Sequence, residues 1–237
     1  MLFSLNVDHI ATLRNARGGA QPDPVTASLI AEQAGVDGIV VHLREDRRHI
    51  SERDVRLLRE LVTTKLDLEM AATEEIIRIA CDVVPDLATI VPEKRLELTT
   101  EGGINVIDSI DILKDAIKDL HNAGVPVSLF IEPEMEQIDA AAEIDADFIE
   151  IHTGVFANAI IEDERIDELE KIRLAAKHAK KLGMGVNAGH GLDYNNIKIF
   201  RELTDIDEVS IGHAVMARAM FVGISEAVRE MITLLRK

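Results

Sequence analysis

The sequence predicts an α/β fold, a (β/α)8 TIM barrel with extra helices in some of the connections that follow its strands. Three observations support this prediction: short apolar segments, charged amphipathic segments between them, and a regular spacing. The apolar segments recur on average about every 29 residues, which suits strand–helix units in a barrel of roughly 250 residues. The alternative is an open doubly wound sheet, but no G-x-G-x-x-G motif follows the first apolar segment. A closed barrel is therefore the preferred fold.

The predicted strands are short runs of mainly aliphatic residues, as expected for parallel strands buried on both faces. In chain order they are LFSLNV (2–7), GIVVHL (38–43), LDLEMA (66–71), LATIV (87–91), VSLFI (127–131), FIEI (148–151), GMGVNAG (183–189) and EVSIG (208–212). The segments between them repeat apolar residues every three or four positions, which is typical of helices that cover a sheet. Four of these predicted helices are DPVTASLIAEQAG (23–35), RDVRLLRELVTT (53–64), TEEIIRIACDVV (73–84) and DILKDAIKDLHNAG (111–124).

The connections between these elements complete the prediction. Gly35 and Gly124 each follow a predicted helix and precede a strand, where glycine commonly ends a helix. The connections after the first, fourth and sixth strands are long enough for additional loops or helices. No linker or low-complexity stretch divides the chain, so we expect one TIM-barrel domain over residues 1–237.

Composition restricts the class of protein. Aliphatic residues must build the core, because aromatic residues are 3% of the chain and Trp is absent. The formal net charge of −17 argues against general binding to nucleic acid or to an anionic membrane. Cys81 is the single cysteine, which excludes an internal disulfide and suits a reducing compartment. No signal-peptide pattern or long apolar run is present, so we expect a cytoplasmic protein.

Polar residues gather at the C-terminal ends of the predicted strands, where a barrel of this type places its active site. The set consists of Asn6, Asp8, His9, His42, Arg44, Glu69, Glu93, Lys94, Arg95, Glu150, His152, Asn187, His190 and His213. Most of the histidines are in this set, whereas His121 and His178 fall on predicted helices. Buried polar groups cost free energy unless they are paired, so this concentration favours an active site over a structural role.

Two carboxylates lie within otherwise apolar strands. Burial of Glu69 favours its neutral form, whereas nearby arginines would favour its charged form. The balance suits a general base, although a buried structural ion pair is the alternative. Glu150 has the same ambiguity, and stabilisation of a cationic intermediate is a further role for it.

Two phosphate pockets are also predicted. Gly-His pairs end the last two strands, in VNAGHGL and SIGHAVM, each just before a predicted helix, and this is the usual phosphate site of the fold. Arg17, Arg44 and His49 can neutralise a second anion. Alternatively, Glu45 and Asp46 hold the arginines in surface ion pairs. The stretch VPEKRLELTTEGGIN (91–105) has a composition suited to a mobile lid, or to an ordinary exposed loop.

These motifs together resemble the pyridoxine 5′-phosphate synthase family. The matching stretches include NVDHIATLRNARGG, HLREDRRHI, LEMA, VPEKRLELTTEGG, IEIHTG, VNAGHGL and IGHAVMARAMFVG, and they extend in order from Asn6 to Gly223. The resemblance implies a transferase that condenses 1-deoxy-D-xylulose 5-phosphate with 3-amino-2-oxopropyl phosphate to pyridoxine 5′-phosphate, phosphate and water. It also implies catalysis without a metal or other cofactor, and a homo-octamer built as a tetramer of dimers.

The resemblance also implies roles for individual residues. His42 and Glu69 are implied to be proton acceptors, His190 the proton donor, and Glu150 a transition-state stabiliser. The implied ligands of the pentulose phosphate are Asp8, His9, Arg44, His49 and Thr99. Those of the amino-ketone phosphate are Asn6, Arg17, Gly191, Gly212 and His213.

Three other functions remain open from the residues alone. A Schiff-base aldolase would use Lys94, at the end of the fourth strand. A metal-dependent hydrolase would use the histidines, although neither an H-x-H nor an H-E-x-x-H pattern is clear. A barrel that only binds phosphosugars would need the phosphate pockets but neither Glu69 nor His190.

Overall fold

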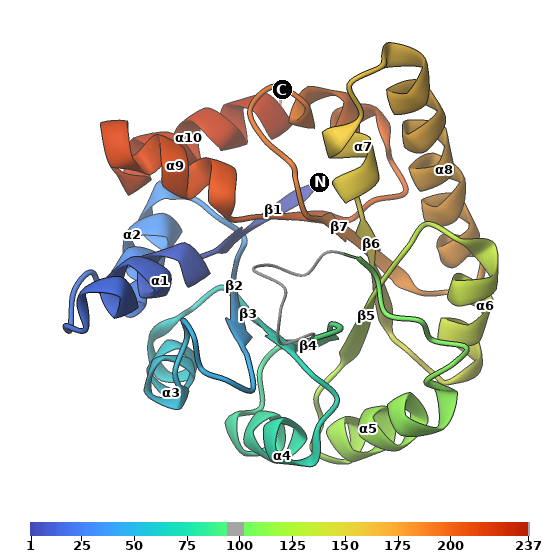
Figure 1. The fold of residues 1–237 in the computed structure, drawn as a ribbon, viewed down its shortest axis with the longest axis horizontal. Helices are drawn as coiled ribbons and strands as arrows, with labels where there is room; N and C mark the ends of the chain where they lie inside the picture. Colours follow the sequence, from blue (N-terminus) through green and yellow to red (C-terminus); the bar gives the residue numbers. More distant parts are fainter. Residues whose placement is uncertain (94–101, 237) are drawn as a thin grey trace.

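The computed structural model describes residues 1–93 and 102–236, and it contains a closed barrel of parallel strands (Figure 1). Each strand pairs with its neighbours in the chain, and β1 closes the barrel against β8. The strands are β1 (Leu2–Asn6), β2 (Gly38–Leu43), β3 (Lys65–Met70), β4 (Leu87–Ile90), β5 (Val127–Ile131), β6 (Phe148–His152), β7 (Gly185–Gly189) and β8 (Glu208–Ile211). The predicted (β/α)8 barrel is confirmed, and every predicted strand overlaps an observed one.

Helices surround the barrel on its outside (Figure 1). They are α1 (Asp8–Arg17), α2 (Pro24–Ala34), α3 (Glu52–Leu61), α4 (Glu74–Val83), α5 (Ile110–Asn122), α6 (Met135–Glu143), α7 (Gly154–Asn158), α8 (Glu162–Lys181), α9 (His213–Val222) and α10 (Ile224–Leu235). Local sequence explains their ends. For example, Asp23 accepts a hydrogen bond from the Val25 N–H at the start of α2, and Gly35 ends that helix with a φ of 108°.

The extra helices agree in part with the prediction. An additional helix follows β1 and β6, as expected, and another follows β8, where none was predicted. The expected helix after β7 is wrong in type and position, because the 3-10 helix η1 (Ile197–Glu202) begins only at Ile197. No helix of the described part of the chain is both long and apolar enough to cross a membrane.

The strands separate an aliphatic layer from a polar barrel interior. On β3, Leu66, Leu68 and Met70 belong to the hydrophobic core, whereas the alternate positions carry Asp67 and Glu69. Other buried polar residues on the strands are Ser4, His42, Thr89, Ser128, Glu150, His152, Asn187, Glu208 and Ser210. Barrel interiors are usually filled by Val, Ile and Leu. Polar groups therefore continue from the strand ends into the barrel.

Some of these interior groups pair with one another. Lys65 Nζ lies 2.5 Å from Glu208 Oε1, and the Thr89 hydroxyl donates to Asp67 Oδ1 at 2.8 Å. Burial and the nearby Glu208 carboxylate, opposed by Lys65, raise the pKa of Asp67 to about 7. The charge of the interior therefore depends on pH near neutrality.

Candidate active site

The predicted residues of strands β1, β2, β3 and β6 come together at the C-terminal ends of the barrel strands. Asn6 ends β1, and Asp8 begins α1 only two residues later. The Asn6 amide donates to Asp8 Oδ2 and its oxygen accepts the Asp8 N–H, both at 2.9 Å. Asp8 Oδ1 in turn accepts the backbone N–H of His42 at 2.9 Å. These bonds tie the ends of β1 and β2 together.

His42 lies between two carboxylates that differ in pKa. Its Nε2 is 2.8 Å from Glu93 Oε1, and its Nδ1 is 3.7 Å from Glu69 Oε2. Burial opposes ionisation of Glu93, but its bonds to His42 and to the Glu45 N–H, with the charge of Arg44, lower its pKa. The sequence places Glu93 at a strand end but indicates no particular role for it. Its contact with His42 crosses 51 residues of sequence, which no local pattern indicates.

Glu69 and Glu150 have a strong tendency to hold a proton. Burial, together with the carboxylates of Glu150, Asp8 and Asp67, raises the pKa of Glu69 well above its ordinary value. Burial, with Asp67 and Glu208, raises the pKa of Glu150 to about 8, although Lys65 opposes this. Among the described residues, a hydrogen bond from Asn6 opposes the rise at Glu69, rather than the arginine that we expected. A carboxyl group with such a pKa can exchange a proton near neutral pH.

His9 and His213 face each other across the ends of β1 and β8, with ring centroids 5.1 Å apart. His9 lies in the first turn of α1, and His213 lies in the first turn of α9. We expected both residues at strand ends and not on helices, and this expectation is wrong. Gly212 precedes α9, and a Cβ there would lie 3.0 Å from the Asn6 Cβ. The free N–H groups at the start of α9 are suited to an anion.

The turn after β7 is a different kind of structure. His190 and Gly191 have φ values of 78° and 77°, and the chain that follows them forms no helix until η1 begins at Ile197. The Thr153 hydroxyl lies 2.8 Å from the Gly189 carbonyl oxygen and 2.6 Å from that of His190. The left-handed turn is therefore anchored to the end of β6. Helix starts were predicted directly after both Gly-His pairs. In the structure only the second pair is followed directly by a helix, α9.

The arginines after β2 fall into two groups: one is buried near the site, and the others form surface ion pairs. Arg44 is buried, at 2% exposure, and its Nε lies 4.0 Å from Glu93 Oε2. Arg47 and Arg48 instead form surface ion pairs, Arg47 with Glu52 and Glu75, and Arg48 with Asp46. Surface pairs of this kind contribute little to stability.

The remaining predicted residues have separate outcomes. His49 approaches the site, with its Nδ1 4.0 Å from Asp8 Oδ1. Arg17 is the exposed last residue of α1, which runs outward from the barrel (Figure 1), so the structure does not bring it into the buried cluster with Arg44. Thr99 and Lys94 lie outside the described residues.

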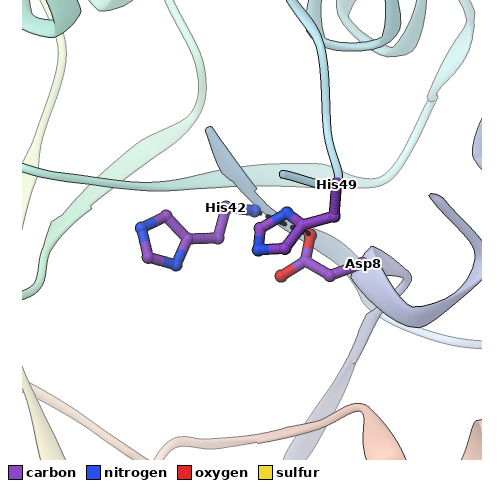
Figure 2. Close-up of side chains that lie close together, drawn as sticks. All are labelled: Asp8, His42 and His49. Carbon is purple, nitrogen blue, oxygen red and sulfur yellow. Dashed lines mark hydrogen bonds and ion pairs between the residues drawn. The ribbon is translucent and has the colours of Figure 1, made fainter. Parts of the chain in front are cut away.

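Asp8, His42 and His49 have potential metal-ligand atoms within 4.8 Å of one another (Figure 2). Most of their polar atoms already contact protein groups. Asp8 accepts from Asn6 and His42, the His49 Nδ1 lies 3.0 Å from the Ile50 N–H, and the His42 Nε2 contacts Glu93. A metal ion would have to break several of these contacts, so we assign no chemical step to one.

Arg14 and Asp54 form a buried ion pair that the sequence did not indicate. Two Arg14 nitrogens contact the two Asp54 oxygens at 2.8 Å each, and Arg14 also donates to the His49 carbonyl oxygen at 3.0 Å. Asp54 additionally accepts from the Ser51 N–H and hydroxyl at the start of α3. The pair therefore joins α1, α3 and the loop that carries His49.

We expect Asp54→Asn to lower the free energy of unfolding by about 2 kcal/mol at pH 7. Burial opposes ionisation of Asp54, but bonds from Arg14, Ser51 and Arg53 lower its pKa from 3.8 to about 2. A lowered pKa in the folded state stabilises the protein above about pH 4, and this stabilisation is lost as the pH falls towards 2. Urea unfolding of both proteins at pH 7 and near pH 2 measures the effect.

The matched control is Asp46→Asn, which removes an exposed partner of Arg48. It should change the free energy of unfolding by less than about 1 kcal/mol. Equal urea midpoints for Asp54→Asn and the unchanged protein at pH 7 would contradict the structural role of the pair.

The fold and this site define a (β/α)8 barrel with histidines and carboxylates gathered at its strand ends. Residues 3–237 match the family model described as "Pyridoxal phosphate biosynthesis protein PdxJ", and the chain belongs to this family. It is 56% identical over 236 residues to the pyridoxine 5′-phosphate synthase of Chlorobium phaeobacteroides, covering 100% of both chains. It is 54% identical over 234 residues to that of Geobacter sulfurreducens, covering 99% of this chain and 98% of the relative.

Solved structures of other barrels agree with the fold. Phosphoribosyl anthranilate isomerase from Thermus thermophilus superimposes with a TM-score of 0.61 at 16% identity, over 99% of this chain and 98% of that one. KGPDC from Streptococcus mutans gives 0.64 at 12% identity, over 99% and 97% of the two chains. At these identities the likeness concerns the fold alone.

Proposed function

We propose that the protein catalyses the reaction named in its relatives, the synthesis of pyridoxine 5′-phosphate. The reaction condenses 1-deoxy-D-xylulose 5-phosphate with 3-amino-2-oxopropyl phosphate and releases phosphate and water, which makes the enzyme a ring-closing transferase. The observation that carries the proposal is the placement of His42 between Glu93 and Glu69, in a chain at least 52% identical to named synthases. Joining an amine to a ketone and then losing water requires several proton transfers, and this cluster offers groups for them.

The proposed roles follow from the protonation of each group. His42 and Glu69 accept protons, and the carboxylate of Glu93 orients the imidazole of His42. Glu150 stabilises positive charge in the transition state when it is ionised. His190, which follows β7, donates a proton to a departing oxygen.

Substrate binding is proposed at two groups of residues. The pentulose phosphate contacts Asp8, His9, Arg44, His49 and Thr99. The amino-ketone phosphate contacts Asn6, Arg17, Gly191, Gly212 and His213. The buried guanidinium of Arg44 and the N-terminus of α9 supply the positive potential that phosphate groups need.

We also propose a cytoplasmic homo-octamer, arranged as a tetramer of dimers, that binds neither nucleic acid nor membranes. Large apolar side chains are exposed on the surface, including Ile160 at 98%, Phe221 at 86% and Met220 at 77%. Exposed apolar groups of this size are typical of protein–protein contacts. Light scattering coupled to gel filtration measures the oligomeric state.

Incubation with both phosphorylated substrates is expected to produce the absorbance of pyridoxine phosphate. Activity should persist in a metal chelator, because the proposed proton transfers use side chains alone. Borohydride treatment with substrate should leave no covalent adduct on Lys94. Absence of product over the whole pH range, with tight binding of both substrates, would instead favour a barrel that only binds phosphosugars.

A further inference from the structure

Three side chains outside the His42 cluster lie at the ends of neighbouring strands, and the middle one contacts the other two. Glu132 follows β5, His152 ends β6, and His190 follows β7. Glu132 Oε1 lies 2.7 Å from His152 Nδ1 and also accepts the Gly103 N–H at 2.8 Å. The rings of His152 and His190 meet edge to face, with centroids 5.1 Å apart. Of these residues, only His190 has a role in the proposed reaction.

The contact with Glu132 determines which nitrogen of His152 carries its proton. An ionised carboxylate only accepts hydrogen bonds, so the Nδ1 of His152 must be the N–H. In the neutral ring, Nε2 then has its lone pair free to accept a hydrogen bond. The ring has little freedom to rotate, because His152 is 5% exposed and packs 5.3 Å from the Phe130 ring.

Gly154 leaves space for this arrangement. A Cβ at Gly154 would lie 2.3 Å from the Nε2 of His152 and 3.1 Å from the Cδ2 of His190. Both imidazoles therefore press against the same point of the backbone. A glycine at this position is required by the close approach of the two rings.

The charges around His190 act in opposite directions. Burial and the neighbouring His152 lower the pKa of His190, whereas the Glu132 carboxylate raises it. Glu132 remains ionised despite burial, because bonds from His152 and the Gly103 N–H lower its pKa. Without this carboxylate, His190 would lose its proton at a lower pH.

We infer that Glu132 and His152 are a positioning pair for His190. Glu132 holds His152 in one tautomer against the His190 ring, and its negative charge keeps a proton on His190. The two residues act through His190 and are not assigned a contact with substrate. The catalytic part of this inference rests on the proposed function, whereas the effect on the protonation of His190 does not.

The test compares Glu132→Gln with Glu132→Asp. Glu132→Gln removes the charge and is expected to lower kcat about tenfold, less than loss of the proton donor itself, with KM nearly unchanged. It should move the alkaline limb of the pH–rate profile to lower pH, because the carboxylate that raises the pKa of His190 is gone. Glu132→Asp keeps the charge, so this limb should stay in place even if kcat falls. Glu134→Gln, two residues away and exposed, is the matched control.

A second measurement does not depend on activity. Diethyl pyrocarbonate modifies only the unprotonated imidazole, so its rate at His190, followed by peptide mass spectrometry against pH, reports protonation of that residue. The midpoint should fall in Glu132→Gln and stay constant in Glu132→Asp and Glu134→Gln. An unchanged midpoint in Glu132→Gln would overturn the inference. A shifted midpoint in a protein that forms no product would support the pair and refute the proposed function.

Discussion

Glu69→Gln is expected to lower kcat by at least about 10²-fold, a typical contribution of a general base. Glutamine has nearly the same size and can still bond to Asn6, but it cannot accept a proton from substrate. Glu69 is the register neighbour of His42, and the two side chains approach to 3.7 Å. Steady-state kinetics with saturating substrates measure the loss.

The unfolding temperature of Glu69→Gln shows whether its lower kcat reflects lost catalysis or a less stable fold. Burial and neighbouring carboxylates raise the pKa of Glu69, so its charged form opposes folding. A raised carboxyl pKa makes the folded state less stable as the pH rises above 4.5, the ordinary value for Glu. Glu69→Gln should therefore unfold at an equal or higher temperature than the unchanged protein at pH 8.

Glu74→Gln is the control for this substitution. Glu74 is exposed at the start of α4, so its change should leave both kcat and the unfolding temperature unaltered. A kcat for Glu69→Gln close to that of Glu74→Gln would remove Glu69 from the mechanism.

His190→Asn is expected to lower kcat by a similar factor, at least about 10²-fold. Asparagine cannot donate a proton as imidazolium does, yet it tolerates the left-handed backbone that His190 adopts with a φ of 78°. The Thr153 contact uses the His190 carbonyl oxygen and is therefore retained. The turn should keep its shape, so that the loss reports chemistry.

The pH profile tests the assigned direction of proton transfer. Because burial and His152 lower the pKa of His190, the protonated donor should be lost on the alkaline side at a lower pH than for an ordinary histidine. His190→Asn should remove this limb from the profile of its residual activity. His178→Asn, in a surface contact with Asp139, should retain both the limb and kcat. Retention of the limb in His190→Asn would assign the donor to another group.

The strands were predicted well because their signals are local. The aliphatic run at residues 127–131, for example, coincides with β5 over Val127–Ile131. The alternation within β3, which separates core residues from Asp67 and Glu69, became clear only in the structure. The connections were predicted less well. Gly223 separates α9 from α10, and a glycine stop of this kind was used elsewhere but not applied there. The Gly-His-Gly stretch at residues 189–191 resembles the start of a helix, but it forms a left-handed turn instead.

The contacts between the predicted site residues could not be read from the sequence. Strand-end positions identified His42, Glu69, Glu150 and His190. Glu132 follows β5 in the same way and was missed, although the same rule would have found it. Arg14 and Asp54 had no signal, because one resembles an ordinary basic residue in the last turn of a helix and the other an ordinary first-turn acid.

The sequence by itself determined the barrel and the polar character of its strand ends, because aliphatic runs, helical periodicity and the polar residues that follow each run are local properties of the chain. Only the tertiary structure decided which groups pair: His42 with Glu93 across 51 residues, Arg14 with Asp54 across 40, and His152 with Glu132 across 20. It also decided protonation, because the pKa of a carboxyl or imidazole depends on burial and on charges that the fold brings near. Those quantities exist only after distant strands meet.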